Sequence, residues 1–114
     1  MYERSRNVVD CHIAGFTYYD GVDVIDKLEL GTPVTLRSEP DNPHDPEAVS
    51  IYYEDTKLGY IPRYKTCYVS KLLYFGHGDI YEAKINSRKL EEKPEFQFRI
   101  VVKLKDNRKD NKNV

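Results

Sequence analysis

A proline-rich loop near the middle of the chain contains the residues best suited to bind a ligand: Glu39-Pro40-Asp41-Asn42-Pro43-His44-Asp45-Pro46. Its prolines cannot donate backbone hydrogen bonds, so we expect a rigid loop rather than a strand. The amide, imidazole and carboxylate groups of Asn42, His44 and Asp45 are then held in place to hydrogen-bond a ligand. A second interpretation stays open, in which Asn42 and Asp45 form Asx turns and bond only neighbouring backbone amides.

Two tyrosine-containing segments are the other candidates for ligand contacts, and each joins two expected elements. The first reads Gly15-Phe16-Thr17-Tyr18-Tyr19, and the second reads Gly59-Tyr60-Ile61-Pro62-Arg63. Tyrosine rings can stack on nucleic-acid bases, although most tyrosines of this chain are expected to pack in half-buried strands and helices. Cations suited to phosphate contacts start in the second segment and continue after it: Arg63, Lys65 and Lys71.

The sequence argues against an enzyme. The acidic and histidine side chains of the loop lack the spacing of a calcium loop or of a zinc-protease helix: Asp41, His44, Asp45 and Glu47. Cys11 and His12 are adjacent, so in a strand they point to opposite faces and cannot form a nucleophile and base pair. We therefore predict no catalytic residues, no metal and no cofactor. A small hydrolase that uses Asp45 and His44 is the least favoured alternative.

Alternating hydrophobic and polar residues predict about six short strands. The strands are expected over 8–15, 34–37, 48–53, 57–61, 81–85 and 96–104. The polar run Glu54-Asp55-Thr56 is typical of a hairpin turn, and the last two strands form a second hairpin around a charged turn near 91–94.

Two short helices are expected between the strands. Over 21–29, with Asp20 near the N-cap, apolar residues recur every three positions, and over 64–75 they recur at spacings of three, four and seven. The first strand connections are too short or too rich in proline for parallel crossovers. We therefore predict a mainly β fold, a small antiparallel β-barrel of about six strands with two short helices, whose closure removes exposed strand edges.

Chain length and charge limit the classes of function. The 114 residues allow a single domain, expected over 1–105, and the polar residues 106–114 are expected to form a disordered tail. No apolar run is long enough for a membrane span and no secretion signal is recognisable, so we expect a cytoplasmic protein without a membrane partner. Residues 1–62 have a net charge of −7 and residues 63–114 of +6. Any binding to nucleic acid is therefore expected to be local.

The order of four segments resembles the HIRAN domain family, and the resemblance covers residues 8–90. These segments are Gly15-x-x-Tyr18, Leu30-Gly31-x-x-Val34-x-Leu36, Glu39-Pro40-x-Asn42-Pro43-x-Asp45-x-x-Ala48-Val49 and Gly59-Tyr60-Ile61-Pro62. The resemblance implies an OB-like barrel, as found in DNA translocases of replication-fork repair and in stand-alone bacterial proteins. It also implies capture of the free 3′ end of single-stranded DNA, between aromatic side chains and an aspartate that accepts a hydrogen bond from the 3′-OH.

Transferred by position, the resemblance assigns Tyr18 to base stacking, Asp45 to the 3′-OH and Asn42 to a polar contact beside it. The full set of expected nucleic-acid contacts is Tyr18, Tyr19, Asn42, His44, Asp45, Tyr60, Arg63, Lys65 and Lys71. The expected partners are single-stranded DNA and a separate helicase, nuclease or other repair protein. The chain departs from its DNA-binding relatives at Thr17, where they have arginine, and at His44, where they have a stacking tyrosine.

A protein-interaction module is the alternative function. In this interpretation the same tyrosine-lined groove accepts a peptide or a partner subunit, and the acidic first half of the chain and the two departures favour it. Salt separates the two functions, because binding through phosphates weakens steeply with added salt.

Overall fold

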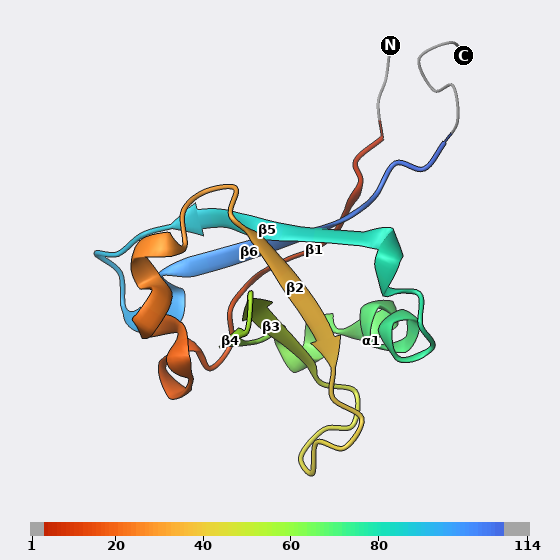
Figure 1. The fold of residues 1–114 in the computed structure, drawn as a ribbon, viewed down its shortest axis with the longest axis horizontal. Coiled ribbons are helices and arrows are strands. Elements are labelled where there is room, and N and C mark those ends of the chain that lie inside the picture. Colours follow the sequence, from red (N-terminus) through yellow and green to blue (C-terminus); the bar gives the residue numbers. More distant parts are fainter. Residues whose placement is uncertain (1–3, 109–114) are drawn as a thin grey trace.

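The computed structural model describes residues 4–108 and has six strands in one antiparallel sheet. The strands are β1 (Asn7–His12), β2 (Pro33–Ser38), β3 (Val49–Tyr53), β4 (Thr56–Tyr60), β5 (Tyr81–Arg88) and β6 (Phe98–Leu104). Their order in the sheet is β1-β6-β5-β2-β3-β4 (Figure 1). Both predicted hairpins are present, β3 with β4 and β5 with β6. The predicted mainly β fold is confirmed.

The sheet curls into a half-barrel that closes at one point. Ala14, just beyond β1, forms an isolated bridge with Tyr60 at the end of β4. The two residues exchange backbone hydrogen bonds, Ala14 N to Tyr60 O at 2.8 Å and Tyr60 N to Ala14 O at 2.9 Å. Closure therefore depends on this bridge. The edges of β1 and β4 are paired with each other less completely than they would be in the closed barrel predicted from the sequence.

Both predicted helices are present, with a different geometry for the first. It is a 3-10 helix, η2 (Asp20–Lys27), with Tyr19 as its N-cap and Asp20 as its first residue, so Asp20 lies near the N-cap as predicted. Apolar residues every three positions match the three residues per turn of a 3-10 helix, and its valines and aspartates have low α-helix propensity. The second is the 3-10 turn η3 (Arg63–Lys65) followed by α1 (Cys67–Tyr74). Three further 3-10 turns are η1 (Phe16–Tyr18), η4 (Gly78–Ile80) and η5 (Pro94–Phe96).

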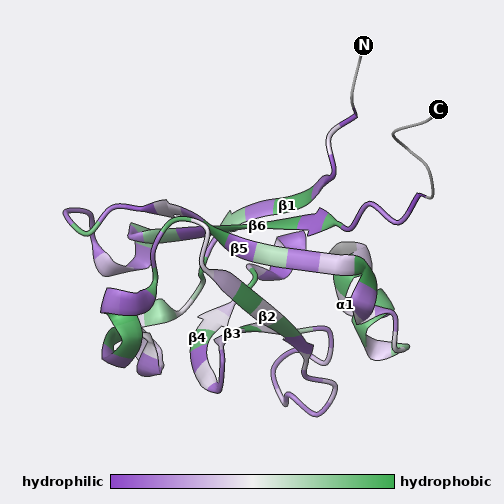
Figure 2. Cartoon of the chain, turned by 45° about the horizontal axis from the view of Figure 1, so that its top comes forward, coloured by the Kyte–Doolittle hydropathy of each residue, from purple (hydrophilic) through white to green (hydrophobic). Residues whose placement is uncertain are grey.

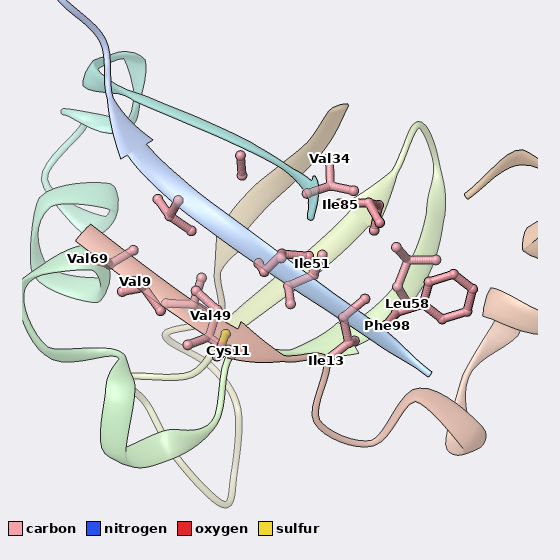
Figure 3. Close-up of a cluster of buried hydrophobic side chains, with 14 of the residues drawn as sticks. Val9, Cys11, Ile13, Val34, Val49, Ile51, Leu58, Val69, Ile85 and Phe98 are labelled. Atoms are coloured by element: carbon pink, nitrogen blue, oxygen red, sulfur yellow. The ribbon is translucent and has the colours of Figure 1, made fainter. Parts of the chain in front are cut away.

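The core lies inside the curl of the sheet, where the inward residues of β1, β3, β4 and β6 meet (Figure 3). Alternate residues of β6 are buried, from Phe98 through Ile100 to Val102, and Cys11 of β1 is buried among them. Each such aliphatic or aromatic side chain contributes about 1.5–3 kcal/mol on burial. Burial raises the pKa of the Cys11 thiol to about 11, so this thiol is structural.

The loop between β2 and β3 is the part of the fold that extends furthest from the sheet, on the side opposite the two chain ends (Figure 1). Its composition is largely hydrophilic, in contrast to the strands on which it is mounted (Figure 2). Within the described residues no helix is long and apolar enough to cross a membrane. Residues 109–114 of the predicted tail lie outside the described part of the chain.

Candidate functional site

An open groove of about 790 Å³ lies between the β2–β3 loop and the point where the half-barrel closes. The loop forms one wall, and Ala14, Tyr19, Tyr60 and Ile61 come from the closure side. The remaining lining residues are Ser38, Glu39, Pro40, Asp41, Asn42, Pro43, His44, Asp45, Ala48 and Arg63. The three segments that the sequence singled out therefore meet in one place.

Asn42 and Asp45 brace the loop from within, as the Asx-turn interpretation predicts. The Asn42 side-chain oxygen accepts hydrogen bonds from the backbone N–H groups of His44 at 2.8 Å and Asp45 at 3.1 Å. One oxygen of Asp45 accepts from the backbone of Glu47 at 3.0 Å. The loop is therefore preorganised, and its side chains do not have to be ordered when a ligand arrives.

Asp45 is the best-placed carboxylate for a ligand hydroxyl. Its second oxygen is 3.3 Å from Arg63 Nε, and the Arg63 guanidinium also donates to the backbone oxygen of His44 at 2.9 Å. The Asp45 side chain is 20% exposed and the Arg63 side chain is 72% exposed, so the cation of this pair lies at the surface and the carboxylate is mostly buried. A carboxylate has about four lone-pair positions, so the two bonds described here leave acceptor capacity on Asp45, which lines the groove.

A polar network that the sequence did not predict joins the base of the loop to β4. Tyr60 donates its hydroxyl proton to Glu39 at 2.7 Å and accepts a hydrogen bond from Lys57 Nζ at 2.6 Å. Lys57 also forms a salt bridge with Glu39 at 2.9 Å, and Asn42 donates to Glu39 at 3.1 Å. The network ties one groove wall to the other, because Glu39 belongs to the loop and Tyr60 to the closure side.

A β-bulge explains why Lys57 was missed. Tyr52 pairs with Lys57 and Ile51 pairs with Gly59, so Leu58 is the extra residue of β4. In a regular strand, residues three apart face opposite sides, and Lys57 would point away from Tyr60. The bulge turns both side chains to the same side. Glu39 could have been suspected from its position at the start of the loop, but the sequence contains no signal for the bulge.

The aromatic wall of the groove consists of Tyr19 and Tyr60. Their rings pack edge to face, with centroids 5.6 Å apart. Lys57 Nζ lies 4.7 Å from the centroid of Tyr19 and 4.3 Å from that of Tyr60, a cation–π arrangement that holds both rings. The groove that Asp45 lines is therefore also lined by two rings that are held in place.

Three of the predicted contact residues lie outside the groove lining. Tyr18 directly precedes the lining residue Tyr19, but it is 84% exposed and does not line the groove. Lys65 donates to the backbone oxygen of Asp10 on β1 at 2.8 Å, and Lys71 lies on α1 beside a second, smaller hollow. The groove itself brings together the other six: Tyr19, Asn42, His44, Asp45, Tyr60 and Arg63. The part of these residues in DNA binding stays a prediction.

Burial and hydrogen bonds shift the pKa of each network member. Burial raises the pKa of Glu39, but hydrogen bonds from Tyr60, Lys57 and Asn42 outweigh it and hold the pKa at about 2. Burial lowers the pKa of Lys57, and hydrogen bonds to Tyr60 and Glu39 overcome it, so the pKa is raised. Burial raises the pKa of Tyr60 to about 12. At neutral pH the network is a carboxylate, an ammonium and a neutral phenol.

Stability is expected to fall as the pH is lowered from about 5 to 2, because the unfolded chain takes up a proton at Glu39 before the folded chain does. The stabilisation is complete above the ordinary pKa of 4.5 and is lost as the pH falls through about 2. The full difference in pKa corresponds to about 3 kcal/mol, and partial exposure reduces this to about 1–2 kcal/mol. Denaturant unfolding across this pH range measures the loss. The variant Glu39→Gln should lose less stability, and an equal loss in the variant would contradict the assignment.

The described residues contain no group of three or more His, Cys, Asp or Glu side chains arranged to hold a metal ion. Two of the three carboxylates that line the groove form salt bridges with cations of the protein. Glu39 is matched with Lys57, and Asp45 with Arg63.

Comparison with known proteins gives the same family that the sequence segments resemble. The HIRAN domain family model matches residues 7–105. A protein of known structure from Lactobacillus plantarum is 22% identical, with a TM-score of 0.67, over 88% of this chain and 97% of its own. The HIRAN domain of human HLTF is 16% identical, with a TM-score of 0.63, over 88% of this chain and 78% of its own. At these identities the two structures show the fold alone. No curated protein sequence matches this chain.

Proposed function

Because the chain belongs to the HIRAN domain family, which is known as a family of DNA-binding modules, we propose that it is a non-enzymatic module that binds single-stranded DNA at a free 3′-OH end. The observation that supports this best is the groove, which is lined both by the carboxylate of Asp45 and by the fixed rings of Tyr19 and Tyr60. A terminal nucleoside offers the two matching features, a flat base and a hydroxyl donor.

The charges in the groove favour a strand end over the middle of a strand. Among the lining residues Arg63 is cationic, and Glu39, Asp41 and Asp45 are acidic. Lys57, which does not line the groove, neutralises Glu39 through a salt bridge. A run of phosphates along this groove would meet net negative charge, and a 3′-phosphate would meet the carboxylate of Asp45 directly. A terminal sugar hydroxyl has no such repulsion and gains a charge-assisted hydrogen bond.

The cellular setting belongs to the same proposal. By resemblance to its relatives, the module acts in DNA repair or in a replication-linked process, and the expected location is the cytoplasm. A separate helicase, nuclease or other repair protein would supply the chemistry that the groove lacks. The departure at His44 favours the protein-interaction alternative, but it is compatible with DNA binding because an exposed imidazole can still stack on a base.

Fluorescence anisotropy with labelled oligothymidine tests the proposal. Wild type is expected to bind a strand with a free 3′-OH about tenfold more tightly than the same strand with a 3′-phosphate or a blunt duplex, the difference of one charge-assisted hydrogen bond. Asp45→Asn should remove that preference while it keeps the acceptor for the backbone of Glu47.

Asp41→Asn is the matched control, because it removes the same charge from the same loop at an exposed position. It should keep the 3′-OH preference. Equal affinity of wild type for all three ligands, or an unchanged preference in Asp45→Asn, would refute end capture by this loop.

A basic peptide is the second candidate ligand, and the acidic lining of the groove favours it. The two ligands differ in how binding responds to the charge of the loop. Asp41→Asn should weaken a basic peptide but leave DNA unchanged or slightly tighter, because the lost charge repels phosphate.

A further inference from the structure

Aromatic side chains are exposed along the segment that leaves the groove. Tyr64 on η3 is 83% exposed and Tyr68 on α1 is 71% exposed. Tyr74 and Phe75 at the end of α1 are also exposed, and their rings pack edge to face with centroids 4.9 Å apart. We call Tyr64, Tyr68, Tyr74 and Phe75 the aromatic face.

The packing of α1 does not require this face. The helix is anchored by Val69, which is 1% exposed, with Leu72 and Leu73 packed against the core. The outward positions of a surface helix are usually charged or polar. Here large rings occupy them, and an exposed set of this kind marks an interaction site.

The charge of the segment identifies the class of ligand. From Pro62 to Gly78 the sequence contains Arg63, Lys65 and Lys71 and no Asp or Glu. Lys71 lies one helical turn after Tyr68 and one turn before Phe75, so a cation stands between two rings of the face. Alternating aromatic and cationic side chains are typical of surfaces that bind single-stranded nucleic acid, where rings stack on bases and cations meet phosphates.

The aromatic face continues from the groove. Arg63 lines the groove and is the first residue of η3, and Tyr64 follows it directly. A second hollow of about 370 Å³ lies between α1 and the loop, lined by Lys71, Tyr74, Phe75, Ser70, Pro46, Glu47 and Pro40. Pro40 lines both the groove and the second hollow, so the two lie on either side of the loop. Figure 1 shows α1 and this loop as neighbours at the same end of the molecule.

We infer that the aromatic face binds the nucleotides on the 5′ side of the captured end. This inference rests on the proposed function. The terminal nucleoside occupies the groove, the strand leaves past Arg63, and the preceding bases stack on Tyr64 and Tyr68 while Lys71 meets a phosphate.

Strand length separates the two sites in an experiment. An oligothymidine of about 4 nucleotides fills the groove, whereas one of about 12 also reaches α1, within the usual range of site sizes. The double variant Tyr64→Ser/Tyr68→Ser changes two exposed side chains and is expected to fold like wild type. It should bind the long strand about tenfold more weakly and the short strand within about twofold of wild type, the effect of losing one or two stacked bases.

Two further variants make the test specific. Tyr68→Leu keeps an apolar side chain but removes the planar ring, and it should weaken long-strand binding as Tyr68→Ser does, because the ring is needed for stacking. Lys71→Gln should reduce the slope of log affinity against log salt by about 0.7, the value for one phosphate contact on a single strand. The control is the double variant Val22→Ser/Leu30→Ser, which changes exposed apolar positions on and after η2. It should change the affinity for neither the long nor the short strand.

The outcomes distinguish this inference from the proposed function. If the long strand binds Tyr64→Ser/Tyr68→Ser as tightly as wild type and the 3′-OH preference persists, the inference is wrong and end capture stands. If the double variant binds the long strand more weakly but wild type shows no 3′-OH preference, the inference about the aromatic face is supported and end capture is wrong. Absence of binding to either strand would overturn both. Self-association of wild type that the double variant abolishes, with DNA binding unchanged, would assign the face to a second copy of the chain.

Discussion

Gly59→Ala is expected to lower the free energy of unfolding by about 3 kcal/mol or more, because the substitution opens the half-barrel. A Cβ on Gly59 would overlap the backbone carbonyl oxygen of Ala14 and lie 2.8 Å from Ile13 Cγ2. That carbonyl accepts the hydrogen bond from Tyr60 that closes the fold. Gly59 also has a φ of 152°, which side chains disfavour. Chemical denaturation followed by circular dichroism measures the loss.

Gly31→Ala is the matched control for Gly59→Ala. Gly31 has a φ of 88°, so alanine is strained there as well, but its Cβ would meet nothing within 4 Å. Its cost is expected to be about 1 kcal/mol, the strain alone. The difference in free energy of unfolding between the two variants measures what the close approach of Gly59 to the Ala14 carbonyl contributes. Equal costs would show that the bridge between Ala14 and Tyr60 does not hold the half-barrel together.

The strands could be predicted from sequence because their burial follows a period of two. The run from Phe98 to Leu104 alternates in sequence and is buried at Phe98, Ile100 and Val102, although Val101 between them is also buried. The loop between β2 and β3 was predictable because its prolines have no backbone N–H group to donate to a neighbouring strand. The type of the helix over Asp20–Lys27 was not, since its apolar spacing fits the first turns of a 3-10 or an α helix equally.

The three segments that line the groove were singled out from the sequence, whereas the polar network of Glu39, Lys57 and Tyr60 was not. Asn42, His44 and Asp45 were singled out because loop residues between prolines are separated from the core pattern, and Tyr60 because its segment joins two expected elements. The salt bridge of Lys57 with Glu39 joins residues 18 apart in sequence and depends on the bulge at Leu58. Strand alternation cannot register such an insertion, so contacts that a bulge creates stay hidden until the pairing of β3 with β4 is known.

Lys57→Met is expected to cost about 2–3 kcal/mol of stability, the second large effect that the structure implies. Methionine keeps most of the side-chain length but leaves the half-buried Glu39 carboxylate without its cation. Tyr60 and Asn42 still donate to Glu39, at 2.7 and 3.1 Å, which limits the loss. The pKa of Glu39 should rise in the variant, so its stability should fall at a higher pH than that of wild type. Denaturant unfolding as a function of pH measures both effects.

A second substitution shows whether the unpaired charge causes the loss. In Lys57→Met/Glu39→Gln no charge is left without a partner, so the double variant should recover part of the stability that Lys57→Met loses. Arg6→Met removes the cation of the exposed Arg6–Glu82 pair, whose atoms are 3.0 Å apart, and should cost less than about 1 kcal/mol. If the double variant were no more stable than Lys57→Met, the loss would come from the packing of Lys57 on Tyr19 and Tyr60. The aromatic wall, rather than the salt bridge, would then be what Lys57 holds in place for the ligand.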